Sequence, residues 1–423
     1  MRRYQNLKKI LLILCMLVLF LTACGSDQAE VESEEFNLET DFQSEYYDWT
    51  TEPHPIVEVE NEEFNLETDF QSEYYDLTSE THPIVEVEDG YYIIVGYYIY
   101  YVDKETMEYT PLCNKPNCLH QEETDQMKVM DCNAMVRLDR LICTNLNYYK
   151  QHLYIAAIEL LADENGMPER KYVMDKLSLD GGEREVIHEF ENPVDTAIVH
   201  RGYIYYSSDF SQIGSNKKTG VYRIPIEGGD EELLYSAESN NQISYLRITG
   251  MNLSFTEYDE ERGHSVCQYN FVNGKVKKIS FGDGIDVVGA RMANGRVYYR
   301  IMKEYKDYNT WSTNLDGSDE RKESFISQHQ DDDYYYETNQ EDKTQTVYDW
   351  KTQKKVTEFS QLVRGGSFFA GKEKLFWYGS NEDGGIKVSY INREDIPKGD
   401  KAVKVLMDFS SDETYPGIVT VTQ

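Results

Sequence analysis

Alternating apolar and polar positions recur in units of similar length from about residue 89 to the end of the chain. The clearest unit is Gly202–Ser236, in which the aromatic and β-branched run Gly202–Ser207 favours a half-buried strand. Gly220–Ile226 alternates in the same way, and Leu233–Tyr235 is a third apolar run. Glu227-Gly228-Gly229 lies between the last two runs, and glycine permits the positive φ of a tight turn. The unit therefore predicts three strands joined by a loop and a tight turn.

Six further stretches repeat this unit, at a spacing of about 37–50 residues. They are Tyr97–Leu112, Tyr154–Phe190, Ser254–Phe281, Arg296–Phe325, Asp333–Phe359 and Lys374–Phe409. A shorter apolar run precedes several units and predicts a fourth strand in each. Examples of this run are Thr196–Val199, Ser244–Ile248, Asp286–Ala290 and Val363–Phe369.

Four strands per unit at this period are typical of a β-propeller. One four-stranded sheet cannot bury both of its faces alone, whereas radial packing lets each blade cover its neighbour. The sequence thus predicts an all-β propeller of about seven blades, with six or eight blades as variants and a β-sandwich pair or a β-helix as competing architectures. Tyr415–Thr422 alternates well enough to close the ring by completing the first blade.

The first 23 residues have the pattern of a bacterial lipoprotein signal peptide. Arg2, Arg3, Lys8 and Lys9 form a basic region, the apolar run Ile10–Leu21 follows, and Leu21-Thr22-Ala23-Cys24 is a lipobox. About 12 apolar residues are too few to span a bilayer core. We expect cleavage before Cys24 and diacylation of its thiol, since two acyl chains suffice for stable anchoring. The alternative is an ordinary secretory signal with a chance cysteine.

Residues 24–88 form an acidic segment that contains a duplication. Glu34–Glu60 and Glu62–Glu88 are identical at 24 of 27 positions, with an offset of 28 residues. No Lys or Arg occurs between Lys9 and Lys104, so both copies are uniformly negative. Like charge and low hydrophobicity favour an extended, disordered spacer before a propeller domain at residues 89–423. The alternating run Pro83–Val87 allows a second interpretation, in which the second copy supplies the first strand of the propeller.

The charge balance excludes one class of partner. The chain has 42 Lys and Arg against 76 Asp and Glu, a formal net charge of −34, and loss of residues 1–23 would bring it to −38. Such a surface repels nucleic acid. Cationic ligands or Ca²⁺ remain compatible with it.

Three cysteines and a histidine stand out in the polar stretch between the first two units. Cys113, Cys118, His120 and Cys132 follow the spacing Cys-x4-Cys-x-His-x11-Cys, which offers a Cys3His ligand set for tetrahedral Zn²⁺. A disulfide, Cys113–Cys118 or Cys118–Cys132, is the other interpretation, and an extracytoplasmic location favours it. It predicts fewer than five free thiols in the mature protein; a free reactive thiol is the third alternative.

The remaining residues carry no recognisable catalytic motif. Cys143 and Cys267 lie in apolar strands and are expected in the core. The acidic groups at Asp331–Asp333, Asn381–Gly384 and Asn314–Asp319 do not match a calcium-loop pattern and are expected to be turns. Most of the 35 tyrosines are expected to pack between blades. We therefore expect no catalytic residue and no bound cofactor, with Zn²⁺ or Ca²⁺ as the candidate metals.

The blade pattern resembles known families. Strands of the form G-x-I-Y-Y and turns of the form D-G-[GS] resemble TolB-like and low-density-lipoprotein-receptor-related-protein-like propellers. The stretch Leu112–His120, followed by Cys132-Asn133-Ala134, is similar to the end of the first blade in propeller lipoproteins of unknown function from Gram-positive anaerobes. The match is loose over residues 89–423 and tight over residues 111–134. The resemblance implies a fold and a location but no activity.

These observations predict a monomeric lipoprotein on the outer face of the cytoplasmic membrane, tethered by diacylglycerol on Cys24. Its expected role is a binding module for a glycan, a peptide or an envelope protein, in the channel or on the loop face of the propeller. One alternative is a hydrolase such as a glycosidase, which needs two carboxylates about 5–10 Å apart. Another is an envelope assembly or sensory component, as the TolB-like resemblance implies.

Overall fold

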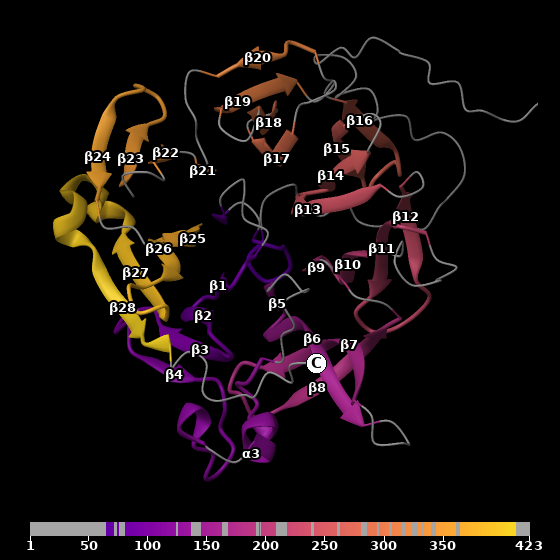
Figure 1. The fold of residues 1–423 in the computed structure, drawn as a ribbon, viewed down its shortest axis with the longest axis vertical. Helices are drawn as coiled ribbons and strands as arrows, with labels where there is room; N and C mark the ends of the chain where they lie inside the picture. Colours follow the sequence, from indigo (N-terminus) through magenta and orange to yellow (C-terminus); the bar gives the residue numbers. More distant parts are fainter. Residues whose placement is uncertain are drawn as a thin grey trace, which may run out of the picture. The chain divides into compact units, whose positions relative to one another are not determined.

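The described residues of the computed structural model form a seven-bladed β-propeller within the compact unit Glu60–Gln423 (Figure 1). The structure describes residues 65–71, 74–75, 81–123, 126–136, 145–162, 168–191, 194, 196–208, 218–237, 241–259, 263–280, 286–293, 296–303, 307–314, 318–323, 329–331, 333–339, 344–360 and 364–411. The expected signal peptide, Cys24, Cys143 and Tyr415–Thr422 lie outside these residues. Within them, no helix is long and apolar enough to cross a membrane.

Each blade is a four-stranded antiparallel sheet made of consecutive strands. The first three blades are β1 (Ile84–Glu86), β2 (Gly90–Val95), β3 (Tyr98–Asp103) and β4 (Tyr109–Pro111); β5 (Leu146–Tyr149), β6 (His152–Ala162), β7 (Pro168–Ser178) and β8 (Arg184–Phe190); and β9 (Thr196–His200), β10 (Tyr203–Ser208), β11 (Gly220–Pro225) and β12 (Glu232–Ser236). The fourth blade is β13 (Gln242–Thr249), β14 (Asn252–Asp259), β15 (Gly263–Asn270) and β16 (Val276–Ser280).

The last three blades follow the same order. They are β17 (Asp286–Ala293), β18 (Arg296–Lys303), β19 (Asp307–Asn314) and β20 (Arg321–Lys322); β21 (His329–Gln330), β22 (Tyr334–Asn339), β23 (Thr344–Asp349) and β24 (Lys355–Phe359); and β25 (Arg364–Ala370), β26 (Lys374–Ser380), β27 (Ile386–Asn392) and β28 (Lys404–Phe409). The helices described are short: η2 (His120–Glu122), α3 (Gln126–Asp131) and η3 (Arg393–Ala402). The prediction of an all-β propeller with seven blades is confirmed.

Blade 3 shows how closely the repeat pattern predicts a blade. The opening unit Gly202–Ser236 supplies β10, β11 and β12, and the preceding run Thr196–Val199 supplies β9. Tyr206 and Tyr222 stack across β10 and β11 with their ring centroids 5.5 Å apart, and Phe190 of blade 2 packs on Tyr206 at 4.9 Å. These tyrosines pack within and between blades, as the sequence predicts.

Blade 1 has four strands from consecutive segments among the described residues, which do not include Tyr415–Thr422. Its sheet runs β1-β2-β3-β4, and Ile84 pairs with Ile93. The second interpretation of Pro83–Val87 is therefore confirmed, and the propeller begins before residue 89. Blade 1 joins blade 7 through side chains: Tyr100 packs against Phe409 at 5.6 Å, and Tyr91 against Phe376 at 4.8 Å.

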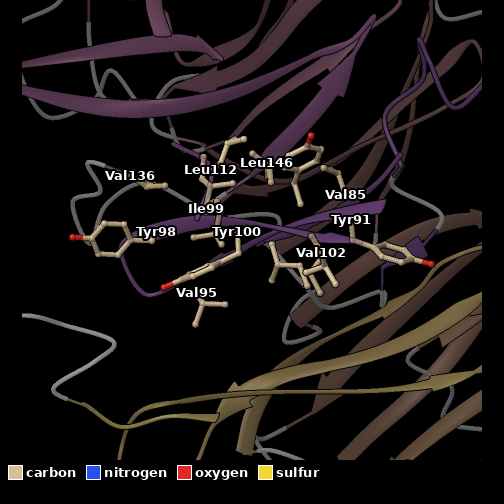
Figure 2. Packing of buried hydrophobic residues seen from close by; sticks show 14 of the residues in the cluster. Val85, Tyr91, Val95, Tyr98, Ile99, Tyr100, Val102, Leu112, Val136 and Leu146 are labelled. Atoms are coloured by element: carbon tan, nitrogen blue, oxygen red, sulfur yellow. The ribbon is translucent and has the colours of Figure 1, made fainter. Parts of the chain in front are cut away.

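One hydrophobic cluster extends across both sides of blade 1. It includes residues of β1, β2 and β3, residues of β26 to β28 in blade 7, and residues of β5 and β6 in blade 2. Figure 2 shows members of this cluster, among them Ile99 of β3 close to Leu112 and Val136. Burial on both faces explains why β2 reads as a continuous apolar run, since each of its six residues is buried.

The second copy of the duplication contributes more than β1. We use hub for the first strands of the blades and the residues that directly follow them, and docked residues for 65–71, 74–75 and 81–82. The docked residues contact the hub in blades 2, 3, 4, 6 and 7, and Figure 1 shows this indigo stretch among the first strands. An extended spacer was expected for these residues; the structure instead places them inside the propeller.

Charged and aromatic side chains hold the docked residues in the hub. Arg201 donates two hydrogen bonds to the carboxylate of Asp69, Nε to Oδ1 and Nη2 to Oδ2, both at 2.8 Å. Tyr75 packs against Phe369 with centroids 5.1 Å apart. Arg247 donates to Nε2 of His82, which is buried. Asp69 and Tyr75 are almost completely buried, so these contacts form part of the protein core.

His200 lies between the docked residues and blade 4. Its Nδ1 accepts a hydrogen bond from the backbone N–H of Phe70 at 3.1 Å, and its Nε2 donates to the carbonyl of Gly250 at 3.0 Å. Burial lowers the pKa of His200 to about 4, although the nearby Asp69 carboxylate acts in the opposite direction. The imidazole is therefore neutral in the folded protein at neutral pH.

A chain that begins at residue 89 is expected to be much less stable than one that begins at Asn61. It lacks β1, which leaves β2 as an unpaired edge, and it lacks Phe70 and Tyr75. The lost burial predicts a midpoint of thermal unfolding lower by at least about 10 °C. Thermal scans of the two chains beside one that begins at Gly25 check this. Equal midpoints for the chains from 61 and 89 would contradict a structural role for the docked residues.

Stability is expected to fall as the pH drops from about 6.5 to 4. In this window the unfolded chain, whose histidine has an ordinary pKa, binds a proton that buried His200 does not bind. His200 contributes up to about 1.4 kcal/mol per pH unit to this slope. Chemical denaturation at several pH values measures it. His200→Gln should flatten the slope, and an unchanged slope in that variant would refute the assignment.

Candidate metal centre

The four residues singled out by spacing come together beside blade 1. β4 leads into the stretch that carries Cys113, Cys118 and His120, and Cys132 directly follows α3. One donor atom from each side chain lies within 4.8 Å of all the others. Among the described residues this is the one group of three or more His, Cys, Asp and Glu side chains gathered closely enough to hold a metal ion. The predicted Cys3His set is therefore a candidate metal site in three dimensions.

The distances are close to those of a tetrahedral centre. Zn–S bonds of about 2.3 Å and Zn–N bonds of about 2.0 Å place sulfur and nitrogen ligands about 3.5 Å apart, and two sulfurs about 3.8 Å apart. The Sγ of Cys132 lies 3.6 Å from Nδ1 of His120. Shifts of about 1 Å or less would bring the remaining donors to tetrahedral separations.

Local backbone geometry presents the ligands. Asn117 has φ 62°, in the left-handed region that asparagine tolerates better than most residues, and it precedes Cys118 in a tight turn. The N–H of Cys118 donates to the carbonyl of Lys115 at 3.3 Å. His120 also has a positive φ, 52°, and the hydroxyl of Tyr98 donates to its carbonyl at 3.1 Å. Tyr98 thus helps to hold the imidazole towards the thiols.

The electrostatics of the cluster favour a bound cation. Burial raises the pKa of Cys132, and the neighbouring Cys113 raises it further. Burial also acts to raise the pKa of Cys113, but hydrogen bonds from the backbone N–H groups of Lys115 and Asn133, together with those of the neighbouring thiols, outweigh burial and lower that pKa. Burial lowers the pKa of His120, which favours the neutral imidazole that binds metals. Three thiolates this close together need a positive charge between them.

The cluster is fixed to the neighbouring blade. Asn133, next to Cys132, donates from Nδ2 to the carbonyls of Gly181 and Gly182 at 2.9 and 3.2 Å, in the turn between β7 and β8. Gly181 has φ +68°, and a Cβ there would lie 2.5 Å from the backbone of Leu112. This close approach requires glycine at the junction. The cluster therefore lies where blade 1 meets blade 2, apart from the hub.

The chemistry open to such a site is structural. Four protein donors complete a tetrahedral shell, whereas a catalytic zinc keeps one position for water or substrate. No disulfide forms among the described residues: Cys113, Cys118, Cys132 and Cys267 are free thiols. Cys267 lies apart from the cluster and is buried in β15, as expected from its apolar context.

The acidic turns behave as predicted where they are described. Asn381 accepts hydrogen bonds at its Oδ1 from the N–H groups of Asp383 and Gly385, which is ordinary turn chemistry. The carboxylate of Asp331 pairs with Arg393 at 2.8 Å.

Sequence reasoning missed the contacts in the hub. Asp69, His82, Arg201 and Arg247 pair across more than 100 positions of sequence, which no local pattern reveals. The aromatic residues of the second copy, such as Phe70, are a feature of its sequence that favours burial over an extended spacer.

Comparison with solved structures finds β-propellers at low identity. A putative TolB from Agrobacterium tumefaciens is 12% identical, over 63% of this chain and 80% of that chain, with a TM-score of 0.35. An oligogalacturonate lyase in complex with manganese is 10% identical, over 73% and 76%, with a TM-score of 0.43. The uncharacterized protein lmo1340 from Listeria monocytogenes EGD-e is 10% identical, over 62% and 81%, also with a TM-score of 0.43. No protein-family model and no curated protein matches the chain. The propeller assignment accordingly rests on strand topology, and these likenesses carry no argument about the site.

Proposed function

We propose that this chain is a lipid-anchored, extracytoplasmic binding module whose Cys3His cluster is a structural zinc centre. The observation that carries the zinc assignment is the convergence of four protein donors within 4.8 Å at a junction between blades. Three sulfurs and one imidazole nitrogen form a ligand set typical of structural zinc and unsuited to Ca²⁺, which prefers oxygen. The ion would tie the end of blade 1 to the turn that Asn133 contacts in blade 2.

The hub contacts support binding over hydrolysis. A glycosidase needs one carboxyl group that stays protonated near neutral pH. Burial acts to raise the pKa of Asp69, but the hydrogen bonds and charge of Arg201, with smaller contributions from its other neighbours, outweigh burial and hold the pKa below its usual value. Glu86, a second buried carboxylate of the described hub, pairs with Lys104 at 2.7 Å. Both groups hold the structure together, so a ligand would use the outer faces of the propeller.

The proposed location follows from the lipobox. It would expose the acidic surface of the propeller to partners outside the membrane. With Cys24 acylated, the propeller would stand outside the membrane with a net charge of about −38 after loss of residues 1–23. A strongly negative surface favours cationic partners through long-range attraction. Cationic peptide segments and glycans that carry amino groups are therefore the ligand classes to test first.

The zinc centre predicts one zinc per chain in protein purified without chelator. Cys132→Ser should lose most of the metal and unfold at a lower temperature, because it removes a ligand and leaves two thiolates near a bare imidazole. Cys267→Ser is the matched control, since Cys267 is buried away from the cluster. Metal analysis by mass spectrometry and thermal scans measure both effects.

Counting thiols separates zinc from a disulfide. The chain from Gly25 has five cysteines, and zinc binding predicts five free thiols after denaturation with chelator and without reductant. Three free thiols in a chain without zinc would overturn the metal assignment in favour of a disulfide.

The anchored binding role is tested in two arms. Cys24→Ser is expected to stop incorporation of labelled palmitate and to move the protein from the membrane fraction to the soluble fraction. The chain from Gly25 is expected to bind cationic peptides or aminated glycans on arrays, with binding weakened at least tenfold between 50 and 300 mM salt. If the Cys24→Ser protein stays in the membrane fraction, the proposed lipid anchor is wrong. If the chain from Gly25 binds nothing on either array, the proposed binding role is wrong.

A further inference from the structure

The contacts that dock the second copy in the hub use residues that the first copy also contains. Each counterpart lies 28 positions earlier: Asn37, Glu39, Thr40, Asp41, Phe42, Gln43, Tyr46, Tyr47 and His54 match Asn65, Glu67, Thr68, Asp69, Phe70, Gln71, Tyr74, Tyr75 and His82. Ile56-Val57-Glu58 likewise matches β1. The first copy thus repeats these hub-contacting residues in the same order.

The three differences between the copies barely affect this set. Trp49, Thr51 and Pro53 stand where the second copy has Leu77, Ser79 and Thr81. Of Leu77, Ser79 and Thr81, the structure describes Thr81. Its hydroxyl forms a hydrogen bond of 3.2 Å with the hydroxyl of Ser367. Loss of this half-buried contact in the first copy is small beside the shared contacts of Asp69, Tyr75 and His82.

The two copies also have the same charge complementarity to the propeller. Neither copy contains a Lys or Arg, so every basic partner comes from the propeller. Arg201 binds Asp69 through two hydrogen bonds, Arg247 donates to His82, and Lys104 pairs with Glu86. The same cations match Asp41, His54 and Glu58 of the first copy.

We propose that the hub is an exchange site, in which residues 34–60 of the same chain replace the second copy. The propeller then has two N-terminal registers, 28 residues apart. In the second register, residues 61–88 leave the hub and form the connection to β2. The cost of closing a loop grows only with the logarithm of its length, so this connection does not forbid the exchange.

The described register is the more stable of the two. The N–H of Val87 donates to the carbonyl of Gly90 at 2.9 Å, which closes a tight turn between β1 and β2. The first copy cannot make this turn, because residues 61–88 separate it from Gly90. The exchange therefore populates a minor state that grows when the second copy is weakened.

The exchange would change the reach of the propeller. The stretch between Cys24 and the hub would shorten by 28 residues, up to about 95 Å of extended chain. This consequence rests on the proposed anchor at Cys24, whereas the exchange itself does not. The experiments on the exchange use the chain from Gly25, which lacks Cys24. Their outcomes therefore do not depend on lipidation or on ligand binding.

Two deletions of equal length test whether the first copy fits the hub. Removal of residues 61–88 joins Glu60 to Asp89 and gives the first copy the short connection that the second copy has now. Removal of residues 33–60 keeps the second copy and serves as the control. We expect both chains to fold, with midpoints of thermal unfolding within about 5 °C of each other. Failure of the first deletion to fold while the control folds would overturn the proposal.

Substitutions in the undeleted chain test whether exchange occurs. Phe70→Ala should lower the midpoint by about 5 °C or more in the chain without residues 33–60, and by clearly less when the first copy is present to replace it. Phe42→Ala alone should have no effect, and the double variant Phe42→Ala/Phe70→Ala should restore the full loss. An equal loss from Phe70→Ala with and without residues 33–60 would refute exchange.

Arg201→Ala is the matched hub variant, because either copy would use Arg201. It should lower the midpoint equally in both chains. Light scattering of the Phe70→Ala chain should show monomers at all concentrations, since the exchange lies within one chain. Dimers whose population rises with concentration would instead show exchange between molecules and overturn the proposal in this form.

Discussion

Closure of the ring by side chains is the constraint on which the rest of the structure depends. Blades 1 and 7 are each complete from consecutive strands, so no described strand is shared between them. Buried Glu86 provides a polar link at this junction: its carboxylate accepts hydrogen bonds from Nζ of Lys104 at 2.7 Å and from the N–H of Lys372 in blade 7 at 2.8 Å. A buried carboxylate is tolerated only when its oxygens are paired in this way. The side chain of Gln71 bonds to both backbone groups of Glu86, which couples the docked residues to the same point.

The docked residues extend this closure around the axis. A segment that binds the first strands of several blades adds contacts between those blades and so stabilises the ring. Here Asp69 engages blade 3, His82 engages blade 4, and Tyr75 engages blades 6 and 7. An N-terminal segment of this acidity would otherwise repel itself and stay extended. The cations of the hub offset that repulsion.

The candidate metal centre lies at the next junction, between blades 1 and 2. The cluster lies at the end of blade 1 and reaches the β7–β8 turn of blade 2 through Asn133 and the close approach of Gly181. The stretch between β4 and β5 already packs Leu112, Val129 and Val136 into the core cluster of blade 1. The proposed ion would add four bonds to the more polar part of this stretch, which carries Cys113, Cys118 and His120. The docked residues thus run through the hub, whereas the cysteine cluster lies at the junction between blades 1 and 2. The docked residues hold the hub, and the proposed zinc centre would also be structural, so the outer faces are where ligands should be sought.

The sequence by itself determined the blades and the ligand set. Alternation with a fixed period predicts four-stranded sheets because strand pairing is local in the chain, as β9 to β12 show. The Cys113–Cys132 spacing predicted a candidate metal site because its four donors lie within 20 residues of one another. The sequence also allowed β1 at the end of the second copy, but the tertiary structure alone decided where the docked residues before it lie. Their composition favours an extended spacer, and only the arrangement of Arg201, Arg247 and Phe369 around the axis makes burial of Asp69, His82 and Tyr75 favourable. Those partners lie more than 100 residues away, so no pattern within the segment encodes them.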